Sequence, residues 1–314
     1  MFSISVIICS HNPREDYLRR VLDALRAQTL SAKDWELLLV DNASKESLAE
    51  RFDLSWHPNV RHIHEEKTGL THARVRGIAE SKGNLLVFVD DDNVLRADYL
   101  ENALKVSANY PFLGALSGSC LPEFEVEPPM ELHPFLAGLL IEKLSESFWA
   151  KLPAAGQALP AGAGMVVCRT VAAYYREQVL HDPLRQALGR SGNKLSAGED
   201  SDMALCGFAL GLGAGRFPEL ELTHLISARR LTLEYLEGIH EGFGYSGTLI
   251  HFIYDPKGQF SPPMWGVPPS VFKSLLLWLV MWVKGKNHVE RRIRLALERG
   301  CRKALRDWQS LAHR

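Results

Sequence analysis

The chain has 314 residues, of which 46% are hydrophobic and 23% are charged, and its formal net charge is −1. This is the composition of an ordinary globular protein with enough apolar residues for one large or two modest cores. A charge so close to zero argues against a general nucleic-acid-binding function, so no nucleic-acid partner is expected.

The five cysteines are scattered along the chain and never form a Cys-x-x-Cys pair. This usage predicts reduced thiols and does not support a disulfide framework or a zinc site. The first eight residues, Met-Phe-Ser-Ile-Ser-Val-Ile-Ile, lack a basic flank and soon meet a polar stretch over 11–16, which is not the pattern of a signal peptide. We therefore expect a cytoplasmic location.

Short apolar runs that end in polar residues alternate with segments of helical periodicity over residues 4–89. This alternation predicts an α/β fold in which parallel strands are joined by right-handed helical crossovers. The expected strands are Ile4–Cys9, Glu36–Asp41, Val60–Ile63 and Leu85–Val89, and the expected helices are Asp16–Gln28 and Gly69–Ser81.

The pattern is looser after residue 93, and from residue 231 onward it is mainly helical. We expect a catalytic domain over 1–230 and a helical C-terminal extension over 231–314. The glycine-rich stretch 211–215 follows a helix and is interpreted as a turn. Further strands are expected at Gly114–Leu121, Met165–Cys168 and Leu220–His224, and further helices at Pro134–Trp149, Thr170–Leu180 and from Glu199 to near Gly211.

Three consecutive carboxylates, Asp90, Asp91 and Asp92, follow the apolar run Leu-Leu-Val-Phe-Val. A buried strand cannot hold unpaired charges, so they should lie at its carboxyl end, where open α/β sheets bind ligands. If the backbone stays extended there, Asp90 and Asp92 point to the same side and offer oxygen ligands to Mg²⁺ or Mn²⁺. The alternative is an acidic loop that caps a helix starting near Ala97.

Five motifs in this order resemble glycosyltransferases of family 2, over Ile4 to about His224. They are Val-Ile-Ile-Cys-Ser-His-Asn-Pro at 6–13, Leu-Leu-Leu-Val-Asp-Asn-Ala-Ser at 37–44, Gly-Leu-Thr-His-Ala-Arg at 69–74, the Asp-x-Asp within 87–92, and Gly-Glu-Asp at 198–200. The resemblance implies a GT-A fold, with a mostly parallel central sheet flanked by helices and a Rossmann-like nucleotide-binding half. No Gly-x-Gly-x-x-Gly follows the first strand, and no P-loop occurs.

The resemblance also implies an inverting, metal-dependent transfer of a sugar from a nucleotide-sugar donor. Asp200 would be the catalytic base, with Glu199 as second choice, and Asp92 and His224 would hold the divalent ion, Mn²⁺ or Mg²⁺. A helix N-cap is the alternative role for Asp200, and packing is the alternative for His224. The residues expected to bind the nucleotide sugar are Ser10, His11, Asn12, Asp41, Gly69, Arg74, Asp90 and Asp91.

The sequence departs from the family pattern at three places. Asn42-Ala43 replaces Asp-Gly, Val75 follows Arg74 where Asn is common, and Gly164 stands where many relatives carry Asn. The first two change detail around the nucleotide, and the third affects an expected contact with the acceptor.

The expected donor is a UDP-sugar and the expected acceptor a glycan or lipid-linked saccharide, in cell-surface polysaccharide synthesis. The alternative is a phosphatase of the haloacid-dehalogenase type, in which Asp90 would be the nucleophile. That motif normally ends the first strand of its domain, whereas here three strand–helix units precede it.

The last part of the chain combines an apolar segment, Ser270–Val283, with a basic tail over 284–314. The tail contains ten Lys or Arg and three acidic residues. Fourteen helical residues extend about 21 Å, less than the roughly 30 Å hydrocarbon core of a bilayer. Trp278 and Trp282 share one helical face. We therefore expect 270–314 to contact the cytoplasmic face of a membrane peripherally. Packing on the catalytic domain, or on a second copy in a homo-oligomer, is the alternative.

Overall fold

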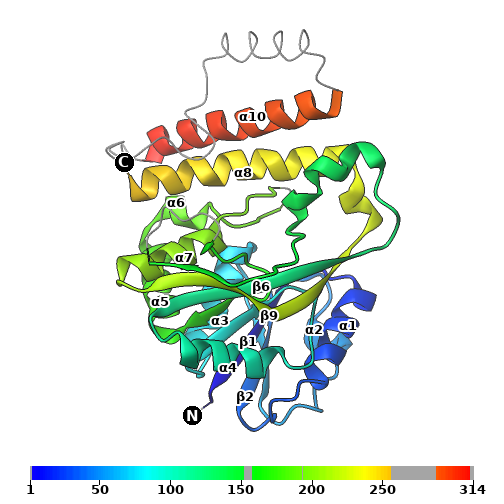
Figure 1. Cartoon of the computed structure of the whole chain (residues 1–314), viewed down its shortest axis with the longest axis vertical. Coiled ribbons are helices and arrows are strands. Elements are labelled where there is room, and N and C mark those ends of the chain that lie inside the picture. Colours follow the sequence, from blue (N-terminus) through cyan, green and yellow to red (C-terminus); the bar gives the residue numbers. More distant parts are fainter. Residues whose placement is uncertain (1, 152–157, 193, 256–287, 312–314) are drawn as a thin grey trace. The chain divides into compact units, whose positions relative to one another are not determined.

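A mixed β-sheet of nine strands dominates one of two units in the computed structural model (Figure 1), which describes residues 2–151, 158–192, 194–255 and 288–311. The sheet unit comprises Met1–Glu125, Leu140–His181 and Asp200–Ile226. The helical unit comprises Val126–Leu139, Asp182–Glu199 and Ser227–Arg314. Each unit is described by itself.

The strand order in the sheet is β3-β2-β1-β4-β8-β6-β9-β5, with β7 paired to β9. The first four strands pair in parallel, as the alternation of strands and helices predicted, while β8 lies antiparallel between β4 and β6. The strands are β1 (Ile4–Ser10), β2 (Trp35–Asp41), β3 (Val60–His64), β4 (Leu85–Val89), β5 (Asn93–Leu95), β6 (Leu113–Phe124), β7 (Phe148–Ala150), β8 (Val166–Cys168) and β9 (Gly213–Ile226).

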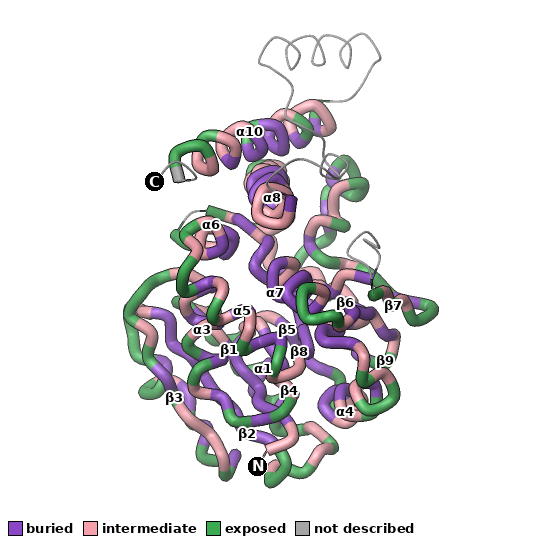
Figure 2. Tube along the Cα trace, turned by 90° about the vertical axis from the view of Figure 1, so that its left-hand side faces the viewer, coloured by how far each residue is buried: buried purple, intermediate pink, exposed green. Residues whose placement is uncertain are grey.

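Helices cover both faces of this sheet, and the strands between them are buried, as the purple tube in Figure 2 shows for β1 and β4. Ile4, Val6 and Ile8 of β1 belong to one core with α1 and α4, whereas Ile7 belongs to a second core with α3, α5 and α7. The alternation follows from the two-residue period of a strand. The helices are α1 (Glu15–Arg26), α2 (Leu48–Arg51), α3 (Leu70–Glu80), α4 (Tyr99–Asn109), α5 (Arg169–His181) and α7 (Glu199–Ala209).

Two expectations about the middle of the chain are wrong. Segment 134–149 is not one helix: a 3₁₀ helix, η1, ends at Leu139, Glu142 bridges Cys120, and β7 follows. Pro134, inside η1, has no N–H for a helical hydrogen bond. Residues 211–215 are not simply a turn, because β9 begins at Gly213. A Cβ at Gly213 would lie 2.5 Å from the carbonyl oxygen of Ala150, so glycine permits the close approach of β7.

The helical unit is built on two long parallel helices, α8 (Leu233–Tyr254) and α10 (His288–Leu311), which lie side by side in Figure 1. Glycines allow close contact: a Cβ at Gly300 would lie 1.9 Å from the carbonyl oxygen of Glu241. The unit also contains η1 (Met130–Leu139), α6 (Pro183–Gln186) and η3 (Ala228–Leu231).

Much of the positive charge expected on the C-terminal tail is paired within this unit. Arg292 binds Glu237 at 2.7 Å, and Arg299 binds Glu241 at 3.1 Å. The apolar segment 270–283 lies outside the described residues. Within the ranges that the structure describes, no helix combines the length and apolar character needed to cross a membrane.

The turn after β2 depends on Asn42, whose side chain is buried. Its amide nitrogen donates to the carbonyl oxygens of Lys67, at 2.6 Å, and Glu65, at 3.3 Å. Its amide oxygen accepts the N–H of Gly69 at 2.7 Å. The departure from the family's Asp at this position therefore supplies two donors, which hold the end of β2 against the start of α3.

We expect Asn42→Asp to lower the free energy of unfolding by about 1–3 kcal/mol, because a carboxylate cannot donate to the two carbonyls and leaves them unsatisfied. Urea unfolding measures this change. Asn84→Asp is the matched control, since Asn84 is exposed and should change stability by about 0.5 kcal/mol or less. Equal unfolding midpoints for the two variants would contradict this role of Asn42.

A second buried polar group, His57, packs between two tryptophans. Its ring centroid lies 4.1 Å from that of Trp35 and 5.4 Å from that of Trp56. Nδ1 accepts the N–H of Asn59 at 3.1 Å. Burial lowers the pKa of His57 from 6.5 to about 4, because the charged ring would lose its hydration.

This lowered pKa predicts an acid-dependent loss of stability. Above pH 6.5 the ring is neutral in both the folded and unfolded states, and as the pH falls toward 4 only the unfolded state gains the proton. His57 should therefore cost about 3 kcal/mol of stability across that window. Urea unfolding of His57→Gln should show a shallower fall over this range. His62, His72 and His240 also have pKa values lowered by burial and should preserve part of the slope. If the free energy of unfolding of His57→Gln falls with pH as steeply as that of the wild-type protein, His57 is not the cause of the acid-dependent loss.

Candidate functional site

The carboxyl ends of β1, β2 and β4 meet at one edge of the sheet. Ser10 is in register with Asp41 across β1 and β2, and Ile8 is in register with Val89 across β1 and β4. The polar residues that follow these three strands therefore converge, as parallel pairing requires. The site was expected at this edge.

The three aspartates after β4 have three different partners. The Ser10 hydroxyl donates to Asp91, Arg74 lies 3.6 Å from Asp90, and His224 lies 3.5 Å from Asp92. The backbone does not stay extended here, because the N–H of Asn93 bonds back to the carbonyl oxygen of Asp90. The extended backbone on which the same-side arrangement of Asp90 and Asp92 was conditional is therefore absent.

His224 reaches Asp92 because the short strand β5 pairs with β9. Asn93 is in register with His224, and the N–H of Leu225 donates to the carbonyl oxygen of Asp92. Both side chains are largely buried. Asp92 Oδ2 and His224 Nε2 are 3.5 Å apart, close enough for both to bind one ion at bond lengths of about 2.1 Å.

This donor pair fits Mn²⁺, which accepts both carboxylate and imidazole ligands, although imidazole is less typical for Mg²⁺. Within the ranges that the structure describes, no three His, Cys, Asp or Glu side chains form a ready metal-binding group. A cation held by Asp92 and His224 would thus need further ligands from a bound substrate or from water, as nucleotide-dependent Mg²⁺ sites commonly have.

Gly162 lies between Arg74 and Asp200. Its N–H donates to Asp200 Oδ2 at 2.8 Å, and a Cβ at this position would lie 3.0 Å from the same oxygen and 3.1 Å from Nη2 of Arg74. Glycine thus lets the catalytic candidate Asp200 lie beside the guanidinium that pairs with Asp90. Arg74 is itself almost fully buried and lies over the ring of Phe88.

Asp200 stands at the start of α7, and its other oxygen, Oδ1, accepts the N–H of Ser201 at 2.7 Å. Asp200 is the second residue of α7 and this bond is to the next residue, so it is not the N-cap contact that was the alternative role. Glu199, the second choice, is 4% exposed, and its carboxylate accepts the N–H of Gly198 at 3.2 Å. Asp200 is the more accessible of the two carboxylates.

Asp41, at the end of β2, accepts hydrogen bonds from two backbone N–H groups. Its carboxylate accepts the N–H of Ser44 at 2.9 Å and of Leu48 at 3.1 Å. Burial raises the pKa of Asp41, but the hydrogen bonds from Ser44 and Leu48 outweigh it and hold the pKa below its ordinary value. The carboxylate stays ionised, and any contact with a nucleobase would use its remaining lone pairs.

The remaining nucleotide-site candidates surround the turn at 42–44. Nδ1 of His11 lies 2.7 Å from the carbonyl oxygen of Asn42, and Asn12, with φ of +50°, receives the N–H of Lys45 on its side-chain oxygen. Gly69 has φ of +132° and precedes α3. These residues lie next to the buried carboxylate of Asp41 in the turn that follows β2.

Two contributors were missed by the sequence interpretation. Gly162 has no chemistry of its own, and its only signal is the Gly-Ala-Gly stretch 162–164. Tyr99 is fully buried, donates to the carbonyl oxygen of Gly164, and lies 2.5 Å from where a Cβ of Gly164 would be. Gly164 has φ of +66°, so a larger residue there would be strained as well as crowded.

The sequence and the fold were compared with those of known proteins. The family model described as Glycosyl transferase family 2 matches residues 5–180. Crystal structures of S. aureus TarS share the fold: one covers 100% of this chain and 55% of TarS, with a TM-score of 0.52 and 13% identity. The fragment 1–349 in complex with UDP-GlcNAc aligns with a TM-score of 0.50 and 12% identity, over 99% of this chain and 92% of the fragment.

Sequence relatives match a shorter region. Glycosyltransferase GlyA of Streptococcus pneumoniae is 34% identical over 110 residues, which are 34% of this chain and 15% of the relative. Glycosyltransferase AglE of Haloferax volcanii is 32% identical over 104 residues, which are 32% of this chain and 34% of the relative. These matches thus span about a third or less of the relatives. The family model, in contrast, matches more than half of the chain, and the chain therefore belongs to glycosyl transferase family 2.

Proposed function

We propose that this protein is an inverting, metal-dependent glycosyltransferase that moves a sugar from a nucleotide-sugar donor to a hydroxyl group of a glycan or lipid-linked saccharide. The observation that carries the proposal is the arrangement of Asp90, Arg74, Gly162 and Asp200. In this arrangement the candidate base, Asp200, lies beside Arg74, which pairs with Asp90. Such an arrangement suits a reaction in which a hydroxyl loses a proton while a phosphate leaves.

A UDP-sugar is the proposed donor. The fold is shared with TarS, which was crystallised with UDP-GlcNAc. Asp41, His11 and Asn12 at the ends of β1 and β2 would contact the nucleotide, and Arg74 would attract its diphosphate through a charge-assisted hydrogen bond.

Asp92 and His224 would hold the divalent ion. A bound Mn²⁺ or Mg²⁺ would supply a Lewis acid that neutralises charge on the diphosphate oxygens. The carboxylate and imidazole lie 3.5 Å apart, and the β5–β9 ladder fixes both backbones. This arrangement supports their role as a preformed pair of ligands.

Asp200 would take the proton. The acceptor oxygen would form a bond to the anomeric carbon, and the bond from that carbon to the diphosphate oxygen would break, with its electron pair leaving on the nucleoside diphosphate. The N–H groups of Gly162 and Ser201 hold the Asp200 carboxylate in one orientation. This fixed orientation supports a role as base, because general bases require defined geometry.

A lipid-linked acceptor would place the enzyme on the cytoplasmic face of a membrane, and peripheral attachment through 270–314 remains part of the proposal. The phosphatase alternative requires Asp90 to attack phosphorus. In this structure Asp90 pairs with Arg74 and follows β4, which ends at Val89, an arrangement that favours the transferase proposal.

Replacing the carboxylate of Asp92 should abolish the metal-dependent part of nucleotide binding. For the wild-type protein, UDP with Mn²⁺ at about 100 times its Kd should add about 2.7 kcal/mol of stability, and Asp92→Ala should remove this gain. Thermal-shift measurements with UDP, GDP, dTDP and CMP, with and without Mn²⁺, test this. Asp34→Ala, which removes an exposed carboxylate, is the control. If no nucleotide stabilises the wild-type protein, the donor proposal fails.

Replacing the base should separate binding from chemistry. Asp200→Asn keeps the shape of the side chain, so donor binding should persist while kcat falls by roughly 10²–10⁴-fold. Donor Kd from calorimetry and turnover of the sugar nucleotide are the two readouts. Near-normal turnover would mean that Asp200 is not the base, and Glu199→Gln would then be measured. An aspartyl-phosphate on Asp90 would favour the phosphatase instead.

A further inference from the structure

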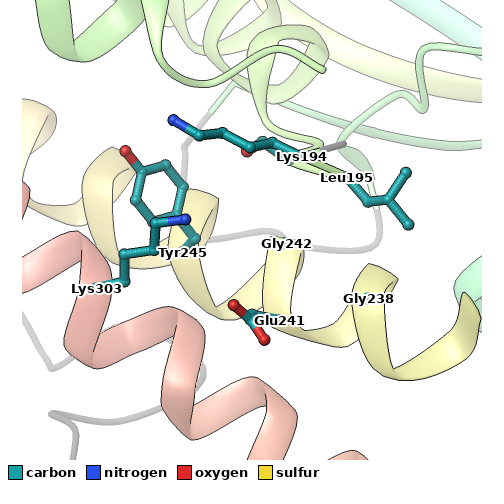
Figure 3. Close-up of a pocket in the computed structure, with 8 residues that line it drawn as sticks. Lys194, Leu195, Gly238, Glu241, Gly242, Tyr245 and Lys303 are labelled. Carbon is teal, nitrogen blue, oxygen red and sulfur yellow. The ribbon is translucent and has the colours of Figure 1, made fainter. Parts of the chain in front are cut away.

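A hollow of about 200 Å³ lies within the helical unit, between segment 194–196, one face of α8 and Lys303 of α10. Figure 3 shows the side chains of Lys194 and Lys303 extending toward the ring of Tyr245 from two different elements. At about 30 Å³ per water molecule, the space would hold roughly six waters, which is enough for a phosphate or diphosphate group.

The wall that carries Lys194 is fixed to α8. A Cβ at Gly242 would lie 2.0 Å from the carbonyl oxygen of Leu195, so the backbone of the segment lies directly on the helix. The N–H of Ala197 donates to Ser246 Oγ of α8 at 3.1 Å. Lys194 therefore extends from an anchored backbone, although its side chain is exposed.

Two lysines and one carboxylate, Glu241, line the hollow. In the part of the chain that the structure describes, neither Lys194 nor Lys303 forms an ion pair, and Lys303 Nζ lies 5.7 Å from the centroid of the Tyr245 ring. The one carboxylate in the lining, Glu241, is neutralised by Arg299 at 3.1 Å. Two ammonium groups thus converge, while the carboxylate of Asp307, one helical turn beyond Lys303, accepts the hydroxyl of Tyr245.

Tyr245 closes the apolar side of the hollow and keeps its proton. It is 5% exposed, and its hydroxyl donates to Asp307 at 2.9 Å. Burial, together with the hydrogen bond to Asp307, raises the pKa of Tyr245. The ring is therefore a neutral surface near the ammonium group of Lys303 and itself adds no negative charge.

We infer that this hollow binds a phosphoryl group, with Lys194 and Lys303 as its two cationic contacts. Lysine binds phosphate as a compact point charge, and two lysines on separate elements match a group with several anionic oxygens. The inference goes beyond the proposed function, since it involves neither the nucleotide-sugar donor nor Asp92, His224 or Asp200. The phosphoryl group can belong to a soluble molecule or to a lipid headgroup.

The test uses the 314-residue chain and two probes. The first is inorganic pyrophosphate, titrated by calorimetry in EDTA at low ionic strength. We expect Lys194→Gln and Lys303→Gln each to raise the Kd about tenfold, which corresponds to about 1.4 kcal/mol per lost charged contact. Binding by the wild-type protein should weaken as salt is added.

The controls separate this site from the others. Arg306→Gln removes the same charge from the same helix outside the hollow and should leave the Kd unchanged. Arg74→Gln, which removes the cation of the proposed donor site, should also leave it unchanged. If Arg74→Gln raises the Kd of pyrophosphate and the lysine variants do not, the anion binds at the donor site and the inference is wrong.

The second probe is a set of phosphatidylcholine vesicles with and without phosphatidic acid, used in co-sedimentation. Loss of binding to the phosphatidic-acid vesicles in Lys194→Gln and Lys303→Gln, but not in Arg306→Gln, would assign the group to a lipid headgroup. Lysine-dependent binding of pyrophosphate alone would assign it to a soluble phosphate. The inference is overturned if neither probe binds, or if the lysine variants bind both probes like the wild-type protein.

Discussion

The antiparallel pairing of Asn93–Leu95 with β9 is the interaction on which the candidate site depends. It turns the chain directly after the three aspartates and puts Asn93 in register with His224, which carries Asp92 to within 3.5 Å of the imidazole. Without this three-residue strand, the acidic segment would be an ordinary loop after a buried strand. The remaining site residues could then still meet at the sheet edge, but no imidazole would stand beside the carboxylates.

This pairing also explains which parts of the site could be predicted. The parallel strands β1, β2 and β4 carry strong local periodicity, so the convergence of Ser10, Asp41 and the aspartates follows from the sequence alone. The orientation of each aspartate does not, because it depends on a turn and on a partner strand more than a hundred residues away. The role of Gly162 is still harder to predict from the sequence, because it depends only on the absence of a Cβ between Asp200 and Arg74.

The expected helix over 134–149 illustrates the same limit in the fold. Its apolar residues look periodic, yet the N–H of Leu144 bonds to Ser119 of β6, and Trp149 belongs to an edge strand. Those contacts are long-range and leave no local pattern. By contrast, α1 was predictable, because its buried residues Leu18, Val21, Leu22 and Leu25 repeat at the helical period.

The departures from the family pattern at Asn42 and Ala43 affect the structure of the turn after β2. Asn42 supplies two donors that an aspartate lacks, while Ala43 adopts φ of +54°, a conformation that costs a non-glycine residue roughly 1–2 kcal/mol. The hydrogen bonds of Asn42 thus help to hold a strained turn that glycine would adopt freely. At this turn, side-chain hydrogen bonds of Asn42 thus replace the backbone freedom that a glycine at position 43 would give.

A similar lesson applies to charge. The tail of the chain has a large formal positive charge, but Arg292 and Arg299 are matched by Glu237 and Glu241 one helix away. Charge counted along a sequence therefore overstates the field at the surface, because pairing across α8 and α10 removes part of it. Part of the remaining charge is local: Lys303 on α10 and Lys194 on the facing segment extend toward Tyr245. Such local charge, and not the total, determines where an anionic ligand would bind on the helical unit.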